Sequence, residues 1–87
     1  MEANELITEQ EWSVISRRLG LGGRMGEIAR RLMDAKADKQ IATELGVSVS
    51  TVRTYLARLF RRVGVDGRVE LIVCVFRELR AVIESEN

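Results

Sequence analysis

The chain has 87 residues, a net charge of +1, no histidine and a single cysteine, Cys74. Without an imidazole base or a second thiol, the composition argues against an enzyme and a zinc site, and it excludes an internal disulfide. There is no secretory signal and no apolar run long enough to cross a bilayer, which together with the lone cysteine indicates a cytoplasmic protein away from membranes. We find no motif for a metal, a cofactor or a small-molecule ligand.

The charge is distributed unevenly along the chain. Residues 1–11 carry −4, residues 12–68 carry +7 and residues 69–87 carry −2. A solvated charged surface is the usual explanation of such a run, but here the basic region includes residues 38–63, whose pattern is that of two helices across a glycine turn. That coincidence favours a nucleic-acid partner. No Pro-rich or Ser-rich linker interrupts the sequence, so we expect one folded unit.

The first two predicted helices have apolar faces, and the first also has a clear start signal. One runs from Thr8 to Leu19, where Thr8 and Glu11 have the spacing of a capping box. The next runs from about Arg24 to Asp34. Its apolar residues recur at the helical spacing of a core-facing stripe: Met25, Ile28, Ala29, Leu32 and Met33.

The next two helices have the pattern of a helix-turn-helix. A short helix from about Asp38 to Leu45 is followed by Gly46, which suits a turn with positive φ, and Ser48 caps a longer helix over about residues 49–63. Its inward stripe is predicted to contain Val52, Leu56, Leu59, Phe60 and Val63. Its outward face is predicted to contain Arg53, Thr54, Ala57, Arg58 and Arg61. Two helices across a tight turn, the second basic on its outer face, are typical of a protein that reads DNA.

A fifth helix is predicted from about Gly67 to Glu84. It is apolar on more than one side: one stripe contains Val69, Ile72, Val73, Phe76, Leu79 and Ile83, and further apolar residues are Leu71, Cys74, Val75 and Val82. Such a helix is expected to have two partners, its own core and a second surface. The sequence therefore predicts an all-α, compact helical bundle: a four-helix unit with a helix-turn-helix, preceded by one additional helix.

From Leu21 to about Phe76 the chain resembles the LuxR-type domain, also called the GerE or FixJ type, of bacterial transcription regulators. The resemblance is strongest in these segments: Ile41-Ala42, Leu45-Gly46-Val47-Ser48, Thr51-Val52-Arg53, Gly64-Val65 and Arg68-Val69-Glu70. The chain departs from the family pattern at Gly22-Gly23, where Thr-Pro is usual, and at Ala35 and Ala37, where Gly and then Ser or Thr are usual. We expect Asp38 to take over the missing helix cap. This divides the chain into an N-terminal extension, residues 1–20, and a LuxR-type domain, residues 21–84.

The expected function is sequence-specific binding of double-stranded DNA, with the helix of residues 49–63 in the major groove. The exposed side of its first turns holds Ser50, Arg53 and Thr54, to which the resemblance also assigns base contacts. Arg53 is the best candidate, because its guanidinium can grip O6 and N7 of guanine. Charge or short donors near helix N-termini make further residues candidates for phosphate contacts: Lys39, Ser48, Thr51, Arg58 and Arg61. For each of them, a solvated surface position is the alternative.

Specific regulators of this size normally bind paired half-sites as two-fold dimers. The fifth helix is the candidate interface, as the resemblance also implies, through Val69, Val73, Val75 and Phe76. The alternative is a helix that only closes the monomer core. An alternative function is a protein-binding adaptor or sigma-factor-like module that contacts another regulator or RNA polymerase. Trp12 would then be an interface anchor rather than a core residue.

Overall fold

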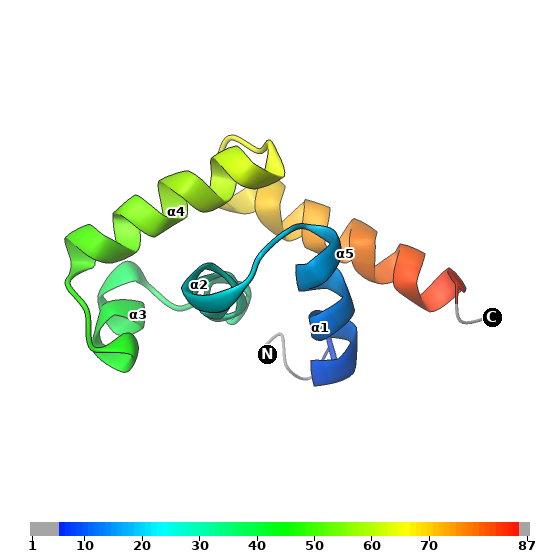
Figure 1. The fold of residues 1–87 in the computed structure, drawn as a ribbon, viewed down its shortest axis with the longest axis horizontal. Helices are drawn as coiled ribbons and strands as arrows, with labels where there is room; N and C mark the ends of the chain where they lie inside the picture. The colour runs from blue at the N-terminus through cyan, green and yellow to red at the C-terminus, as the bar shows by residue number, and fades with distance from the viewer. Residues whose placement is uncertain (1–5, 86–87) are drawn as a thin grey trace.

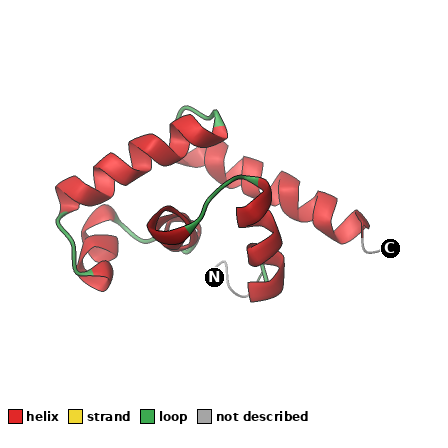
Figure 2. Cartoon of the chain, viewed as in Figure 1, coloured by secondary structure: helices red, strands yellow, loops and turns green. Residues whose placement is uncertain are grey.

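The structure is a computed structural model that describes residues 6–85, which form five helices and no strand. The helices are α1 (Glu9–Arg18), α2 (Gly23–Met33), α3 (Asp38–Leu45), α4 (Val49–Val63) and α5 (Arg68–Ser85). Figure 2 shows helices joined by short loops. The all-α prediction is confirmed, and the predicted helix bounds agree with the observed ones to within one residue. The first five residues of the predicted N-terminal extension lie outside the described range.

The longest interior helix, α4, organises the packing. It lies across α3 and α2, while α1 packs mainly on α5 at the other end of the molecule (Figure 1). The inward stripe of α4 is confirmed, because Val52, Leu56 and Leu59 are buried. They join buried side chains of α2 and α3 in one apolar core: Ile28, Ala29, Leu32, Met33, Ile41 and Ala42. This packing fixes the rotation of α4 about its own axis and leaves its opposite face in solvent.

The additional helix α1 begins as the sequence predicts. The Thr8 hydroxyl accepts a hydrogen bond from the Glu11 amide, and the Glu11 carboxylate accepts one from the Thr8 amide. Arg30 of α2 then ties this region to the core: its Nη2 donates to the Ile7 carbonyl at 3.0 Å, and its guanidinium lies 5.5 Å from the centroid of the Trp12 ring. Trp12 is partly buried and packs against the core, so the structure favours the packing role over an interface anchor.

The last helix, α5, has two different apolar sides. Leu71, Val75, Leu79 and Val82 face the core, and Val75 is completely buried. The assignment of Val75 to an interface is therefore wrong, because a side chain enclosed by its own fold cannot contact a partner. The other apolar side is exposed and contains Val69, Val73, Phe76 and Ile83.

One turn forces a non-glycine residue into the left-handed conformation. Gly46 and Gly64 end α3 and α4 with φ of +67° and +84°, as a residue without a side chain does easily. After α2, Ala35 adopts φ of +62°, where its Cβ crowds the following carbonyl. The strain is held in place because the Lys36 amide donates to the Arg31 carbonyl and closes the end of α2. Glycine is therefore the residue that this turn favours.

A three-way ion pair closes the same corner of the fold. Glu44 of α3 lies 2.9 Å from Nε of Arg31 on α2 and 2.7 Å from Nζ of Lys36 in the following loop. Hydrogen bonds from Lys36 and Arg31 lower the pKa of the Glu44 carboxyl below its ordinary value of 4.5. The folded state therefore stabilises the ionised carboxylate of Glu44.

We predict that Ala35→Gly raises the free energy of unfolding by about 0.5–1 kcal/mol. Relief of the left-handed strain outweighs the larger chain entropy of glycine in the unfolded state. Thermal unfolding should show a rise in Tm of roughly 2–8 °C for a domain of this size. Gly46→Ala is the matched control and should lower Tm, because its φ is equally left-handed. A lower Tm for Ala35→Gly would contradict the strain argument.

We predict that the stabilisation provided by Glu44 depends on pH in one direction. Because its folded-state pKa is lowered, the contribution is complete above the ordinary value of 4.5 and is lost as the pH falls through the lowered pKa. Urea unfolding of the parent and of Glu44→Gln, repeated from pH 7 down to pH 3, should show a stability difference that shrinks with acidification. A difference that stays constant would show that the ion pairs do not couple to folding.

Candidate nucleic-acid interface

The turn between α3 and α4 is closed by local hydrogen bonds. The left-handed Gly46 lets the Val47 amide return to the Ala42 carbonyl at 3.0 Å. Ser48 then starts α4: its Oγ accepts from the Thr51 amide at 3.0 Å and lies 2.9 Å from the Thr51 hydroxyl. Ser48 thus caps α4, as the sequence predicts, and the start of α4 is fixed relative to α3.

The three predicted base-contacting residues share one exposed face at the start of α4. Ser50, Arg53 and Thr54 are all exposed, and the side chain of Arg53 is 71% accessible. The Thr54 hydroxyl donates to the Ser50 carbonyl at 3.0 Å, so it retains its acceptor capacity and its methyl group for a ligand. Helix α1 packs on α5, at the other end of the molecule, and leaves this face open (Figure 1).

Asp38 has a different role from the predicted one. The cap position of α3 is Ala37, whose amide donates to the Gln40 side chain at 3.0 Å, so the prediction that Asp38 caps this helix is wrong. Asp38 is the first residue of α3, and its carboxylate accepts from Nε of Arg53 at 3.4 Å and from Nη2 of Arg68. It thereby joins α3, α4 and the start of α5.

A basic hollow continues the outer face toward the end of α4. Arg58, Arg61 and Arg62 line it together with Met25 of α2, around a volume of about 260 Å³. Arg62 also donates from Nη1 to the Gly20 carbonyl at 3.2 Å and so fastens α4 to the loop before α2. The structure therefore brings Arg58 and Arg61 together, as two neighbouring candidates for phosphate contacts.

Lys39 is exposed but stands apart from these arginines. It lines a shallow hollow made only by α3 and its cap residue, together with Gln40, Thr43 and Glu44. In the chain it directly follows Asp38, whose carboxylate contacts Arg53. Thr51 is partly buried beside its cap, Ser48. The predicted phosphate set thus consists of Ser48 and Thr51 at the start of α4, Arg58 and Arg61 farther along that helix, and Lys39 on α3.

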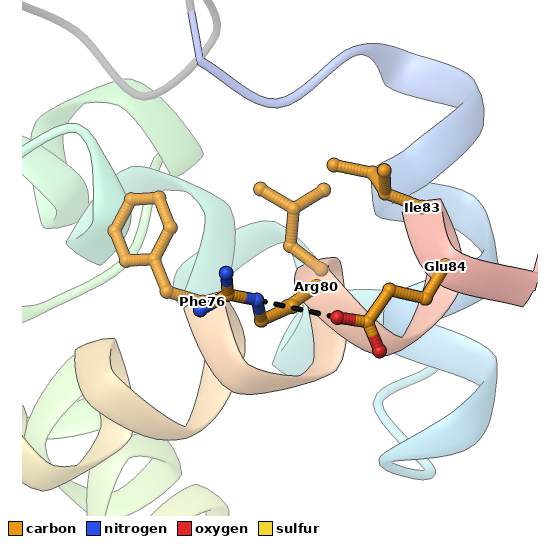
Figure 3. Close-up of a pocket in the computed structure, with 5 residues that line it drawn as sticks. Phe76, Arg80, Ile83 and Glu84 are labelled. Carbon is orange, nitrogen blue, oxygen red and sulfur yellow. Dashed lines mark ion pairs between the residues drawn. The ribbon is translucent and has the colours of Figure 1, made fainter.

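The exposed side of α5 forms a second surface. A hollow of about 420 Å³ is lined by Phe76, Leu79, Arg80, Ile83 and Glu84, and Figure 3 shows Phe76 and Ile83 projecting to the same side of the helix. Arg80 pairs with Glu84 at 3.3 Å beside them. A further hollow of about 390 Å³ lies toward the start of α5, where Val69 and Val73 contribute to its lining.

Asp38 and Arg68 are the functional candidates that sequence reasoning missed. The available signal was charge: Asp38 and Glu44 are the only acids between Lys36 and Val65, in a strongly basic region. An isolated acid among arginines indicates an ion pair, but its partner depends on how three helices meet. Within residues 6–85 no cluster of three or more acidic or cysteine side chains could hold a metal ion, and no helix is long and apolar enough to span a membrane.

Comparison with known proteins agrees with this geometry. The family described as bacterial regulatory proteins, luxR family, matches residues 20–75, more than half of the chain. The spore germination protein GerE of Bacillus subtilis (strain 168) is 35% identical over 51 residues, which cover 59% of this chain and 69% of that protein. No solved structure matches the chain significantly. The chain belongs to the LuxR family of bacterial regulatory proteins, which are DNA-binding transcription regulators and generally not enzymes.

Proposed function

We propose that the chain is a sequence-specific regulator that inserts α4 into the major groove of double-stranded DNA. One observation carries the proposal: the first turns of α4 present Ser50, Arg53 and Thr54 on an exposed face directly after the rigid Gly46 turn. A major groove is wide enough for one helix, and its base edges distinguish all four base pairs. Since the bacterial chromosome lies in the cytoplasm, we expect the protein to act there.

In this arrangement Arg53 reads guanine. Its guanidinium is exposed and can donate two parallel hydrogen bonds to O6 and N7. Thr54 offers a methyl group to thymine and an oxygen that accepts a hydrogen bond, because its hydroxyl hydrogen is directed to Ser50. Ser50 supplies a small polar group that can meet more than one base. Arg53 therefore contributes most of the discrimination.

The phosphate backbone is gripped on both sides of these residues. Ser48 and Thr51 lie at the N-terminus of α4, where the helix dipole and amide groups favour an anion. Arg58 and Arg61 line the basic hollow farther along the helix and have no ion-pair partner within residues 6–85. Lys39, exposed near the N-terminus of α3, is a further candidate. These contacts supply affinity and orientation rather than sequence preference.

We propose in addition that two copies pair through α5. Val69, Val73, Phe76 and Ile83 are exposed and follow one another at the spacings of a coiled-coil seam, with Arg80 between the last two. Several exposed apolar residues along one side of a helix are unfavourable in water unless a partner covers them. A two-fold pair would cover both lines at once and present two copies of α4 to paired half-sites.

The same apolar line is the observation that favours the second candidate, an adaptor that docks on another protein such as RNA polymerase. The two functions differ in their need for nucleic acid. A mobility-shift titration on random duplex DNA at low salt separates them: retention that weakens as salt is raised supports the DNA-binding regulator. Absence of retention at any salt concentration supports the adaptor.

We predict that Arg53→Ala and Arg58→Ala weaken DNA binding in different ways. Arg53→Ala should cost about 1–3 kcal/mol on the preferred sequence and reduce the preference itself. Arg58→Ala should weaken all sequences alike and reduce the slope of log K against log salt by about one. Titrations of a selected and a scrambled duplex at several salt concentrations measure both effects.

Arg17→Ala is the matched control for these arginines. Its side chain is exposed in the last turn of α1, which packs at the other end of the molecule from the α4 face. It should change neither the preference nor the salt slope appreciably. Equal loss of preference from Arg53→Ala and Arg58→Ala would contradict the division into base and phosphate contacts.

We predict that Val73→Glu dissociates the pair without unfolding the chain. Val73 is 49% exposed, so a carboxylate there remains hydrated in the monomer but would be buried beside apolar groups in the pair. Sedimentation should show the variant as a monomer at concentrations where the parent is a dimer. Val75→Glu is the contrasting variant and should unfold the protein, because Val75 lies in the core. A parent that stays monomeric on DNA would rule out pairing.

A further inference from the structure

One carboxylate holds the proposed base-reading arginine in position. Asp38 is only 21% exposed and accepts hydrogen bonds from Arg53 of α4 and Arg68 of α5. It is one of the few acids in a basic region, and it stands at the N-terminus of α3, where the helix dipole also favours its negative charge. The carboxylate is therefore fixed from several directions before any ligand arrives.

The contact uses the side of the Arg53 guanidinium that base reading does not need. Asp38 accepts from Nε at 3.4 Å, and the side chain of Arg53 is nevertheless 71% exposed. The two terminal nitrogens make no hydrogen bond among residues 6–85 and remain available to a ligand. Those two nitrogens are the donors that a guanidinium presents end-on to O6 and N7 of guanine.

We propose that Asp38 is a positioning residue that determines sequence specificity by presenting Arg53 to the major groove. This rests on the proposed function, in which Arg53 reads a base. A free arginine side chain loses much rotational freedom when it is immobilised on a base, and it can instead reach any nearby phosphate. Arg53 held by Asp38 has lost part of that freedom already, so less is lost on binding the correct base.

Asp38 also opposes binding to the wrong sequence. While Asp38 holds Arg53, the guanidinium is kept from nearby phosphates, which it could otherwise contact in a complex with any sequence. Both effects act in the same direction on the ratio of specific to non-specific affinity. Specificity can be gained by weakening wrong complexes as well as by strengthening the right one.

Arg68 acts as the support for this arrangement. As the first residue of α5 it holds the other carboxylate oxygen of Asp38, so the carboxylate cannot rotate without breaking a second ion pair. Arg68 itself is 42% exposed and belongs to α5 rather than to the exposed face of α4. Arg68→Gln should therefore reduce specificity less than Asp38→Asn and in the same direction.

The test begins with the parent chain, which selects a preferred duplex from a random library. Dissociation constants are then measured for that duplex and for a scrambled one. The specificity ratio is the dissociation constant of the scrambled duplex divided by that of the preferred duplex. Asp38→Asn should bind the scrambled duplex more tightly and reduce this ratio by roughly three- to tenfold, the range expected for one side chain that is no longer held in place. Asp38→Glu keeps the charge but displaces the carboxylate, and it should reduce the ratio without strengthening binding to the scrambled duplex.

Glu44→Gln is the matched control. Glu44 is also an acid of α3 that pairs with two basic side chains. These are Arg31 of α2 and Lys36 of the following loop, and neither belongs to α4. It changes the net charge by the same amount as Asp38→Asn and should leave the ratio unchanged. An equal fall in the ratio for both variants would show that charge alone is responsible and would overturn the proposal.

A double-mutant cycle shows whether Asp38 acts through Arg53. In an Arg53→Ala background, Asp38→Asn should produce no further fall in the ratio, because the residue it positions is gone. An equal fall in both backgrounds, or an unchanged ratio in Asp38→Asn and Asp38→Glu, overturns the inference. A parent chain that enriches no sequence at all instead overturns the proposed function, and the inference with it.

Discussion

Burial of Val52, Leu56 and Leu59 is the constraint on which the rest of the structure depends. These residues lie on one side of α4, and a helix repeats every 3.6 residues, so burying them determines which residues point outward. The orientation of the polar face of α4 therefore follows directly from the burial of its apolar face. The same packing against α2 and α3 makes the face rigid, which a reader of base edges requires if its side chains are to arrive already aligned.

Ion pairing, more than composition, locates the positive surface. Several basic residues are neutralised within the fold: Arg18 by Glu78, Arg24 by Glu27, and Arg31 and Lys36 by Glu44. Arg58 and Arg61 have no such partner among the described residues and stand together on α4. Exposed pairs add little stability, but they cancel charge wherever they form. The positive charge that no ion pair neutralises therefore includes a cluster along α4, although the net charge of the whole chain is only +1.

The sequence was sufficient for features that depend on neighbours in the chain. The Thr8 cap, the Gly46 turn and the inward stripe of α4 are local patterns, and the structure confirms each of them. It was insufficient where distant segments meet. Val75 and Val73 are equally apolar, and the packing of α5 against α1 and α4 determines which of them is enclosed. Asp38 is a residue type that often caps helices. Whether it binds a local amide or two arginines depends on where α4 and α5 lie.

The connection between α4 and α5 determines how the two proposed surfaces would work together. α4 ends at the left-handed Gly64, and α5 begins at Arg68, so little flexible chain separates them. The Asp38 carboxylate bridges both helices, which opposes rotation of one relative to the other. If two copies join through α5, the distance and angle between their α4 helices are therefore set by the fold and not by the DNA. Such a pair would accept one spacing of half-sites and reject others, so α5 would contribute to the choice of operator without touching a base.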